Sequence, residues 1–281
     1  MESCRSTHFV ALANQKGGVG KTTTAINLGA GLTALKKKVL LVDIDPQANA
    51  TSGIGLEKQE NQSLYSVLLG AASVEEKILP TAYRNLDIIP AEIDLAGAEI
   101  DIARSEGYLH RLCEAFEPLR NSDRYDYVLL DCPPSLGILT MNGLTAANSV
   151  LIPMQCEYYA LEGLSVITDL IERLRSGGAN PDLSLDGIVM TMCDMRTNLA
   201  RQVVEEVRKH FGEAVYDSLI PRSIRVSEAP SYGKPIVDYD RDAPAAKAYK
   251  QLAREFIARK QPPPAEAQEE NLKDSQMPPP P

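Results

Sequence analysis

The sequence predicts an α/β fold with a doubly wound, mostly parallel sheet flanked by helices. Short runs that are apolar throughout recur along the chain, and longer segments of helical period separate them. Strands that are apolar on both faces are typical of a sheet covered on both sides, and alternation with helices is typical of parallel strand order. No apolar run reaches the roughly 18 residues of a membrane-spanning helix, so we expect a soluble protein.

The predicted elements alternate in chain order. The apolar, β-rich runs that predict strands are 8–13, 38–44, 86–90, 125–131, 149–155, 187–192 and 215–220. The predicted helices are 21–35, 161–176, 198–211 and 244–260. The last of these places Ala245, Ala248, Leu252 and Phe256 on one side, which favours packing of that side against the sheet.

The chain divides into one domain, residues 1–260, and a tail, residues 261–281. The tail is acidic, rich in proline and closes with four prolines, a composition that cannot bury enough apolar area to fold. We expect the tail to be disordered, and a partner-binding polyproline segment remains open.

The distribution of charge and the spacing of the cysteines limit the classes of protein to which this chain can belong. The formal net charge is −9, but residues 193–260 carry 13 basic and 10 acidic residues, so the carboxyl-terminal third is locally basic. The five cysteines are widely spaced without a C-x-x-C pair, which favours reduced, mostly buried thiols. No apolar leader precedes the first predicted strand, so we expect a cytoplasmic protein.

A phosphate-binding loop follows the first predicted strand. The pattern G-x-x-x-x-G-K-T ends at Gly20, Lys21 and Thr22, but Gln15 stands where the first glycine usually falls. The loop opens a predicted helix, where backbone N–H groups and the helix dipole favour phosphate. We expect ATP and Mg²⁺ here, with Lys21 on the β- and γ-phosphates and Thr22 on the metal. The residues predicted to bind the nucleotide are Gly17, Gly18, Val19, Gly20, Lys21, Thr22 and Thr23.

Three aspartates stand at the carboxyl ends of predicted strands. Asp43 and Asp45 are two residues apart, which would place both on one strand face, beside the phosphate loop. Asp131 ends an apolar run as a Walker B aspartate does, and would hold Mg²⁺ through a water. The alternative for Asp43 and Asp45 is a strand-end carboxylate that caps the next turn. Cys132, next to Asp131, is expected to be a packed residue.

Several strings resemble the ParA/MinD family of deviant Walker A ATPases over residues 8–258. Residues 13–24 and 127–135 resemble the family as a whole, and residues 43–53, 155–163 and 225–231 are similar to its short chromosomal ParA type, often called Soj. The resemblance implies that Lys16 reaches across an ATP-sandwiched dimer to the partner's phosphates. It also implies that Asp45 positions the attacking water, that Asp43 neighbours the magnesium region and that Pro221 lies against adenine. An ordinary strand-ending proline is the alternative for Pro221.

The same resemblance implies a DNA-partitioning ATPase. An ATP-bound homodimer would bind double-stranded DNA non-specifically on the nucleoid, and a ParB-type protein would stimulate hydrolysis and so release the dimer. Arg196 and Arg225 match family arginines on the DNA backbone, although each could instead pair with a neighbouring acid, Asp194 or Glu228.

Two rival functions remain. A MinD-like membrane-associated regulator shares the nucleotide chemistry, but it ends in a basic amphipathic helix that the acidic, proline-rich tail cannot form. We therefore expect no membrane partner. A nucleotide-occupied binding module that never hydrolyses ATP is disfavoured because Lys21, Thr22, Asp45 and Asp131 are all present.

Overall fold

The computed structural model describes residues 7–158 and 160–260. Its centre is a seven-stranded sheet in the order β3-β4-β2-β5-β1-β6-β7. All pairings are parallel except that of β3 with β4. The strands are β1 (His8–Leu12), β2 (Val39–Asp43), β3 (Leu79–Pro80), β4 (Leu86–Ile89), β5 (Tyr127–Asp131), β6 (Ser149–Gln155) and β7 (Ser184–Thr191).

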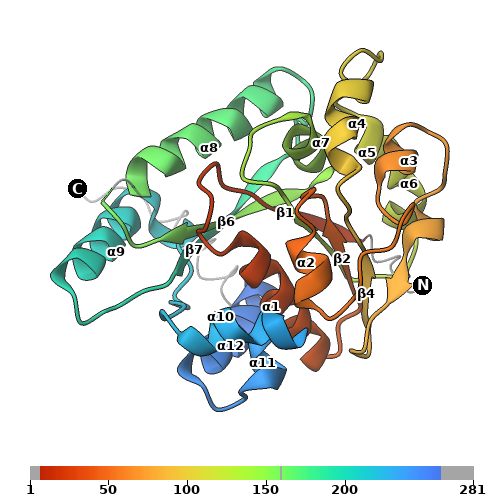
Figure 1. Ribbon diagram of the computed structural model, residues 1–281. Helices are drawn as coiled ribbons and strands as arrows, with labels where there is room; N and C mark the ends of the chain where they lie inside the picture. Colours follow the sequence, from red (N-terminus) through yellow and green to blue (C-terminus); the bar gives the residue numbers. More distant parts are fainter. Residues whose placement is uncertain (1–6, 159, 261–281) are drawn as a thin grey trace, which may run out of the picture.

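Helices lie on both faces of this sheet (Figure 1). One face packs against α3 (Tyr65–Leu68), α4 (Leu95–Ile102), α5 (Arg111–Ala115), α6 (Glu117–Arg120), α7 (Ile138–Ala146), α8 (Ala160–Ser176) and α9 (Asn198–Phe211). The other packs against α1 (Lys21–Ala34), α2 (Asn49–Gly53), α10 (Ile224–Glu228), α11 (Ile236–Tyr239) and α12 (Pro244–Arg259).

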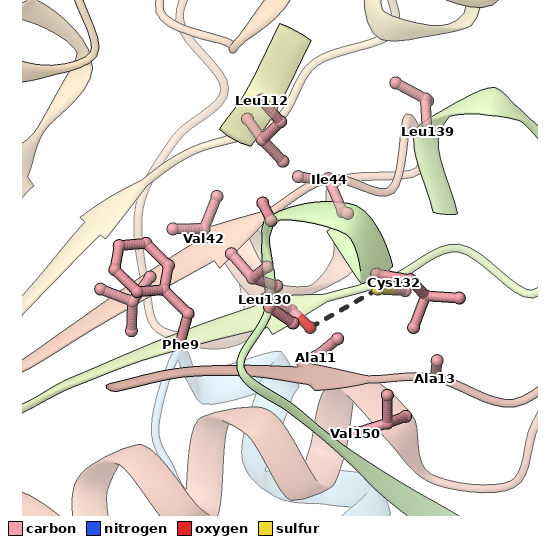
Figure 2. Close-up of a cluster of buried hydrophobic side chains, with 14 of the residues drawn as sticks. Phe9, Ala11, Ala13, Val42, Ile44, Leu112, Leu130, Cys132, Leu139 and Val150 are labelled. Atoms are coloured by element: carbon pink, nitrogen blue, oxygen red, sulfur yellow. Dashed lines mark hydrogen bonds between the residues drawn. The ribbon is translucent and has the colours of Figure 1, made fainter. Parts of the chain in front are cut away.

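The sheet separates two hydrophobic clusters, one on each face, because successive side chains of a strand point to opposite faces. In β1, Phe9 and Ala11 belong to one cluster, while Val10 and Leu12 belong to the other. Figure 2 shows the first cluster, in which Phe9 and Ala11 lie near Val42 and Cys132. Cys132 is fully packed there and its thiol donates to the Leu130 carbonyl, so the packed role expected for it is confirmed.

The structure confirms the predicted fold class and most predicted elements, but the strand predicted at 215–220 is wrong. This segment runs beside β7 and makes only isolated bridges, at Val215 and at Pro221. The N–H groups of Asp217 and Ser218 instead donate to the Glu255 carboxylate of α12, at 2.8 and 3.0 Å. A regular ladder cannot form where a side chain takes these donors.

The predicted tail, residues 261–281, lies outside the described residues. Within 7–158 and 160–260, no helix combines the length and the apolar character needed to cross a membrane.

Candidate active site

A pocket of about 620 Å³ opens at the carboxyl ends of β1, β2, β5 and β7. Because β5 lies between β1 and β2, the loops that follow these three strands meet at one edge of the sheet. The β2–β5 register puts Asp43 directly opposite Asp131. Of the residues predicted to bind nucleotide, Gly17, Gly18, Gly20, Lys21, Thr22, Thr23 and Pro221 line the pocket.

The phosphate loop joins β1 to α1 through left-handed backbone. Gly18 has φ of 73° and Gly20 has φ of 87°, values that strain any residue with a Cβ. Lys21 is the first residue of α1, and its Nζ donates to the Lys16 carbonyl at 3.1 Å, so the loop curls around this lysine. Burial lowers the pKa of Lys21, and the neighbouring Asp131 opposes that shift.

Two polar residues that the motif did not identify hold the loop in place. Asn14 donates to the Pro153 carbonyl of β6 at 2.9 Å and accepts the Lys16 N–H at 3.0 Å. Thr191, the last residue of β7, donates to the Val19 carbonyl at 2.7 Å. Val19 itself is buried and does not line the pocket, so its predicted contribution is backbone only. The loop is thus fastened to two neighbouring strands.

Lys16 lies outside the pocket that its own loop surrounds. Its side chain is 50% exposed and forms an ion pair with Glu157, which is 42% exposed and follows β6. An exposed ion pair of this kind adds little net stability, so it holds the ammonium group only loosely.

Asp43 and Asp45 have different surroundings. Asp45 lines the pocket, and its Oδ1 accepts the Gln47 N–H at 2.9 Å. Asp43 is fully buried, and its oxygens accept the Asp45 N–H and both the N–H and the hydroxyl of Thr51. Burial raises the pKa of Asp43 to about 6. The Asp43 bonds are those of a strand-end cap, the alternative weighed above, and its contact with metal stays a prediction.

Asp131 supplies the test of whether Mg²⁺ fits. In the described part of the chain both of its oxygens are buried and make no hydrogen bond, although the Thr22 hydroxyl lies near enough to lower its pKa. Burial and the nearby Asp43 nevertheless raise the pKa of Asp131 well above its usual range. A buried carboxylate without a partner is costly, and a hydrated cation beside Thr22 and Asp131 would remove that cost. The residues therefore fit a magnesium site.

The wall opposite the phosphate loop comes from the chain after β7. Met192, Ile220, Pro221 and Val226 give it an apolar surface, as a planar base requires. Cys193 fixes Pro221 in place, because its N–H donates to the Ile220 carbonyl at 2.9 Å and its carbonyl accepts the Arg222 N–H at 3.2 Å. Sequence reasoning found Pro221 but not the neighbours that complete this wall.

The two arginines predicted to bind DNA both lie on the surface. Arg196 is 90% exposed and pairs with both oxygens of Asp194, at 2.8 and 2.7 Å. Arg225 is 59% exposed and pairs with Glu228 at 3.1 Å and more loosely with Asp240. Each arginine therefore pairs with the neighbouring acid that was named as its alternative partner.

Comparisons with known proteins identify the family of this chain. A family model described as an AAA domain matches residues 7–185. Chromosome partitioning protein ParA of Caulobacter vibrioides (strain NA1000 / CB15N) is 49% identical over 258 residues, covering 92% of this chain and 96% of that protein. Sporulation initiation inhibitor protein Soj of Bacillus subtilis (strain 168) is 53% identical over 251 residues, covering 89% of this chain and 98% of that protein.

A solved structure shares both fold and sequence. Cobyrinic acid a,c-diamide synthase from Mycobacterium smegmatis with bound ADP and magnesium superposes with a TM-score of 0.77 at 36% identity, covering 89% of this chain and 94% of that chain. The phosphate loop, the strand-end aspartates and this similarity define an ATPase that uses ATP and Mg²⁺. The chain belongs to the ParA/Soj family of chromosome-partitioning ATPases.

Proposed function

We propose that this protein is a cytoplasmic, nucleoid-associated ATPase that partitions chromosomal DNA. Two copies enclose ATP between them, the dimer binds double-stranded DNA without sequence preference, and a ParB-type protein stimulates hydrolysis. Hydrolysis separates the dimer and releases the DNA. The name of the relative in Caulobacter vibrioides supports chromosome partitioning as the process.

The position of Lys16 is the observation that supports an ATP-joined dimer. Its backbone belongs to the phosphate loop, yet its side chain points away from the pocket and meets Glu157 instead. Lys21 already lies in the pocket, where it can bind the nucleotide of its own chain. A second, half-exposed ammonium group at the pocket's rim suits the phosphates of a nucleotide held by a facing copy. ATP would then join the two copies.

Within each copy the described contacts support distinct roles. Lys21 and the N–H groups of the loop would hold the phosphates, and Thr22 and Asp131 would hold hydrated Mg²⁺, with Asp43 beside them. Bound Mg²⁺ neutralises charge on the phosphates. Asp45 faces the pocket with one oxygen bonded to Gln47, so its other oxygen can orient a water toward the terminal phosphate.

DNA binding is proposed for the surface that carries Arg196 and Arg225. Each arginine must leave an acidic partner to contact a phosphate, and exposed ion pairs cost little to exchange. One copy offers few such contacts. A dimer doubles them while losing translational freedom once, so DNA affinity should depend on ATP and fall steeply with salt.

The test is binding of random-sequence duplex DNA with ATP and with ADP over a series of salt concentrations. We expect much tighter binding with ATP and a steep salt dependence. Lys16→Ala should still bind nucleotide through Lys21, but should lose ATP-driven dimerisation and DNA binding together. Lys209→Ala, which removes a lysine from the end of α9, is the matched control.

Equal DNA affinity in the two nucleotides would overturn the proposal. Dimerisation of Lys16→Ala at the wild-type ATP concentration, measured by sedimentation, would remove the role given to Lys16.

A further inference from the structure

Two cysteines that are far apart in sequence meet beside the active site. Cys156 follows β6 and Cys193 follows β7, and the parallel register of these strands sets Gln155 opposite Thr191. The Sγ atoms of Cys156 and Cys193 lie 3.1 Å apart. A disulfide has a sulfur–sulfur bond of about 2.05 Å, so the sulfurs need to approach by only about 1 Å.

The two thiols differ in access and in acidity. Cys156 is partly exposed, whereas Cys193 is buried. The contact between the two thiols lowers the pKa of Cys156 and raises the pKa of Cys193. Cys156 is therefore the thiol that ionises first and that a reagent can reach from solvent. The buried Cys193 would act as the resolving thiol.

The other described cysteines lack this arrangement. Cys132 is fully buried, its thiol donates to the Leu130 carbonyl, and burial raises its pKa. Cys113 is partly buried beside the core. Residues 7–158 and 160–260 contain no group of three or more His, Cys, Asp or Glu suited to a metal ion.

We propose that Cys156 and Cys193 form a redox modification site that a hydroperoxide converts into a reversible intramolecular disulfide. Cys156 ionises to a thiolate, which attacks one oxygen of hydrogen peroxide; the O–O bond breaks, and the departing hydroxide takes up a proton, equivalent to the one that Cys156 released, and leaves as water. Cys193 then attacks the resulting sulfenic sulfur, forms the S–S bond and expels a second water. Two thiols are oxidised by two electrons and one peroxide is reduced.

The disulfide would restrain the segment that carries Glu157, the ion-pair partner of Lys16. Cys156 directly precedes Glu157, the partner of the Lys16 ammonium group. Cys193 is bonded through its backbone to Ile220 and Arg222 in the apolar wall. A covalent link between these positions fixes the Glu157 segment to the end of β7. This consequence rests on the proposed function of Lys16, and we infer that oxidation weakens ATP-driven dimerisation.

The modification is tested on the full-length reduced protein titrated with hydrogen peroxide. Remaining thiols are then blocked, and peptides are mapped by mass spectrometry with and without dithiothreitol. We expect one peptide pair joined by a disulfide between Cys156 and Cys193, with the loss of two thiols. The protein should remain a monomer, and dithiothreitol should fully reverse the link. Cys113→Ser should behave as wild type, and Cys156→Ser and Cys193→Ser should each lack the linked pair.

The proposed site would be overturned if Cys156 and Cys193 both remained free thiols under conditions that oxidise free cysteine. Disulfides between chains in place of the intramolecular one would overturn it too. The coupling has its own readout, which is dimerisation with ATP before and after oxidation. We expect several-fold weaker dimerisation in oxidised wild type and no change in Cys156→Ser. Unchanged dimerisation of the disulfide form would overturn the coupling, whereas failure of reduced wild type to dimerise would instead overturn the proposed function.

Discussion

Asp43, Asp45 and Asp131 are three carboxyl groups at one edge of the sheet with three different sets of partners. Asp43 is bonded on both oxygens, Asp45 on one, and Asp131, within the described residues, on neither. A carboxylate that is already bonded cannot easily serve a ligand, while one buried without a partner favours a cation. The differences in bonding therefore support a capping role for Asp43 and the proposed water-orienting and metal-holding roles of Asp45 and Asp131.

The role of Asp45 can be tested by two substitutions. Asp45→Asn keeps an oxygen for the Gln47 N–H but removes the charge, and Asp45→Ala removes both. We expect hydrolysis by each variant to fall about 100-fold or more, because orientation and charge at the attacking water are lost. ATP binding and ATP-driven dimerisation should remain, as measured by nucleotide titration and sedimentation.

Asn49→Ala, which changes another residue lining the pocket, is the control for the pocket surface. Normal hydrolysis by Asp45→Asn would show that the carboxylate does not orient the water.

At this scale the sequence identified the residues whose type and spacing define a motif. Gly20, Lys21 and Thr22 were recognisable because phosphate binding allows few alternatives. Asn14 and Thr191 were not, because their function is to fasten the loop to β6 and β7, and a polar residue at a strand end has many other uses. The Lys16–Glu157 ion pair joins residues 141 positions apart and left no local signal.

At the scale of elements, the amino ends of β1, β6 and β7 share a polar network on the edge opposite the active site. Nε2 of His8 and Oγ of Ser149 lie 3.1 Å apart, and Ser149 donates to Asp186 at 2.8 Å. Asp186 also accepts from Tyr216 and pairs with Lys260. Burial and the positive charge of Lys260 lower the pKa of His8 to about 4. The network thus holds a neutral histidine.

This histidine should make the protein sensitive to mild acid. The pKa of His8 is about 4 in the folded chain against 6.5 ordinarily, so the unfolded chain takes up the proton first as pH falls. Its contribution is fully present above pH 6.5 and is lost between 6.5 and 4, a loss on the order of 3 kcal/mol. His8→Gln, which keeps a donor for Ser149 without titrating, should have a flatter acid limb in urea unfolding measured at several pH values. Parallel curves for the two proteins over that pH range would contradict this prediction.

Long elements were predictable and short ones were not. Helix 198–211 matches α9, and its cap, Thr197, accepts the Ala200 N–H. The helices between β2 and β5 span four to eight residues each, too few for a periodic pattern to stand out from a loop. The segment 215–220 has the composition of a strand, but the distant Glu255 of α12 accepts two of its N–H groups, which the sequence pattern did not indicate.

At the scale of the whole molecule, the locally basic third of the chain holds Arg196 and Arg225 in exposed ion pairs with neighbouring acids. Arg225→Glu should therefore leave the fold and ATP-driven dimerisation intact while greatly weakening DNA binding and reducing its salt dependence. Arg175→Glu makes the same charge change on α8, over the other face of the sheet, and should bind DNA as wild type does. Filter binding over a salt series measures both. Equal losses in the two variants would show that net charge, and not this surface, governs DNA binding.

Fold class and family could be read from the sequence because the nucleotide motif and the strand pattern agree. The choice against a MinD-like regulator rested on residues 261–281, outside the described part of the chain, and the ParA and Soj relatives now support it independently. The meeting of Cys156 and Cys193 could not be foreseen, because it depends on the register of β6 and β7.

The irregular segment beside β7 has a consequence for association between chains. Open strand edges can pair with other molecules, and this segment occupies the outer edge of β7 through the N–H groups of Tyr216 and Ile220. The same segment ends at Pro221, in the wall of the nucleotide pocket. If the nucleotide packs against Pro221 as predicted, its binding should also help to hold this cover on the sheet edge and so oppose edge-to-edge aggregation.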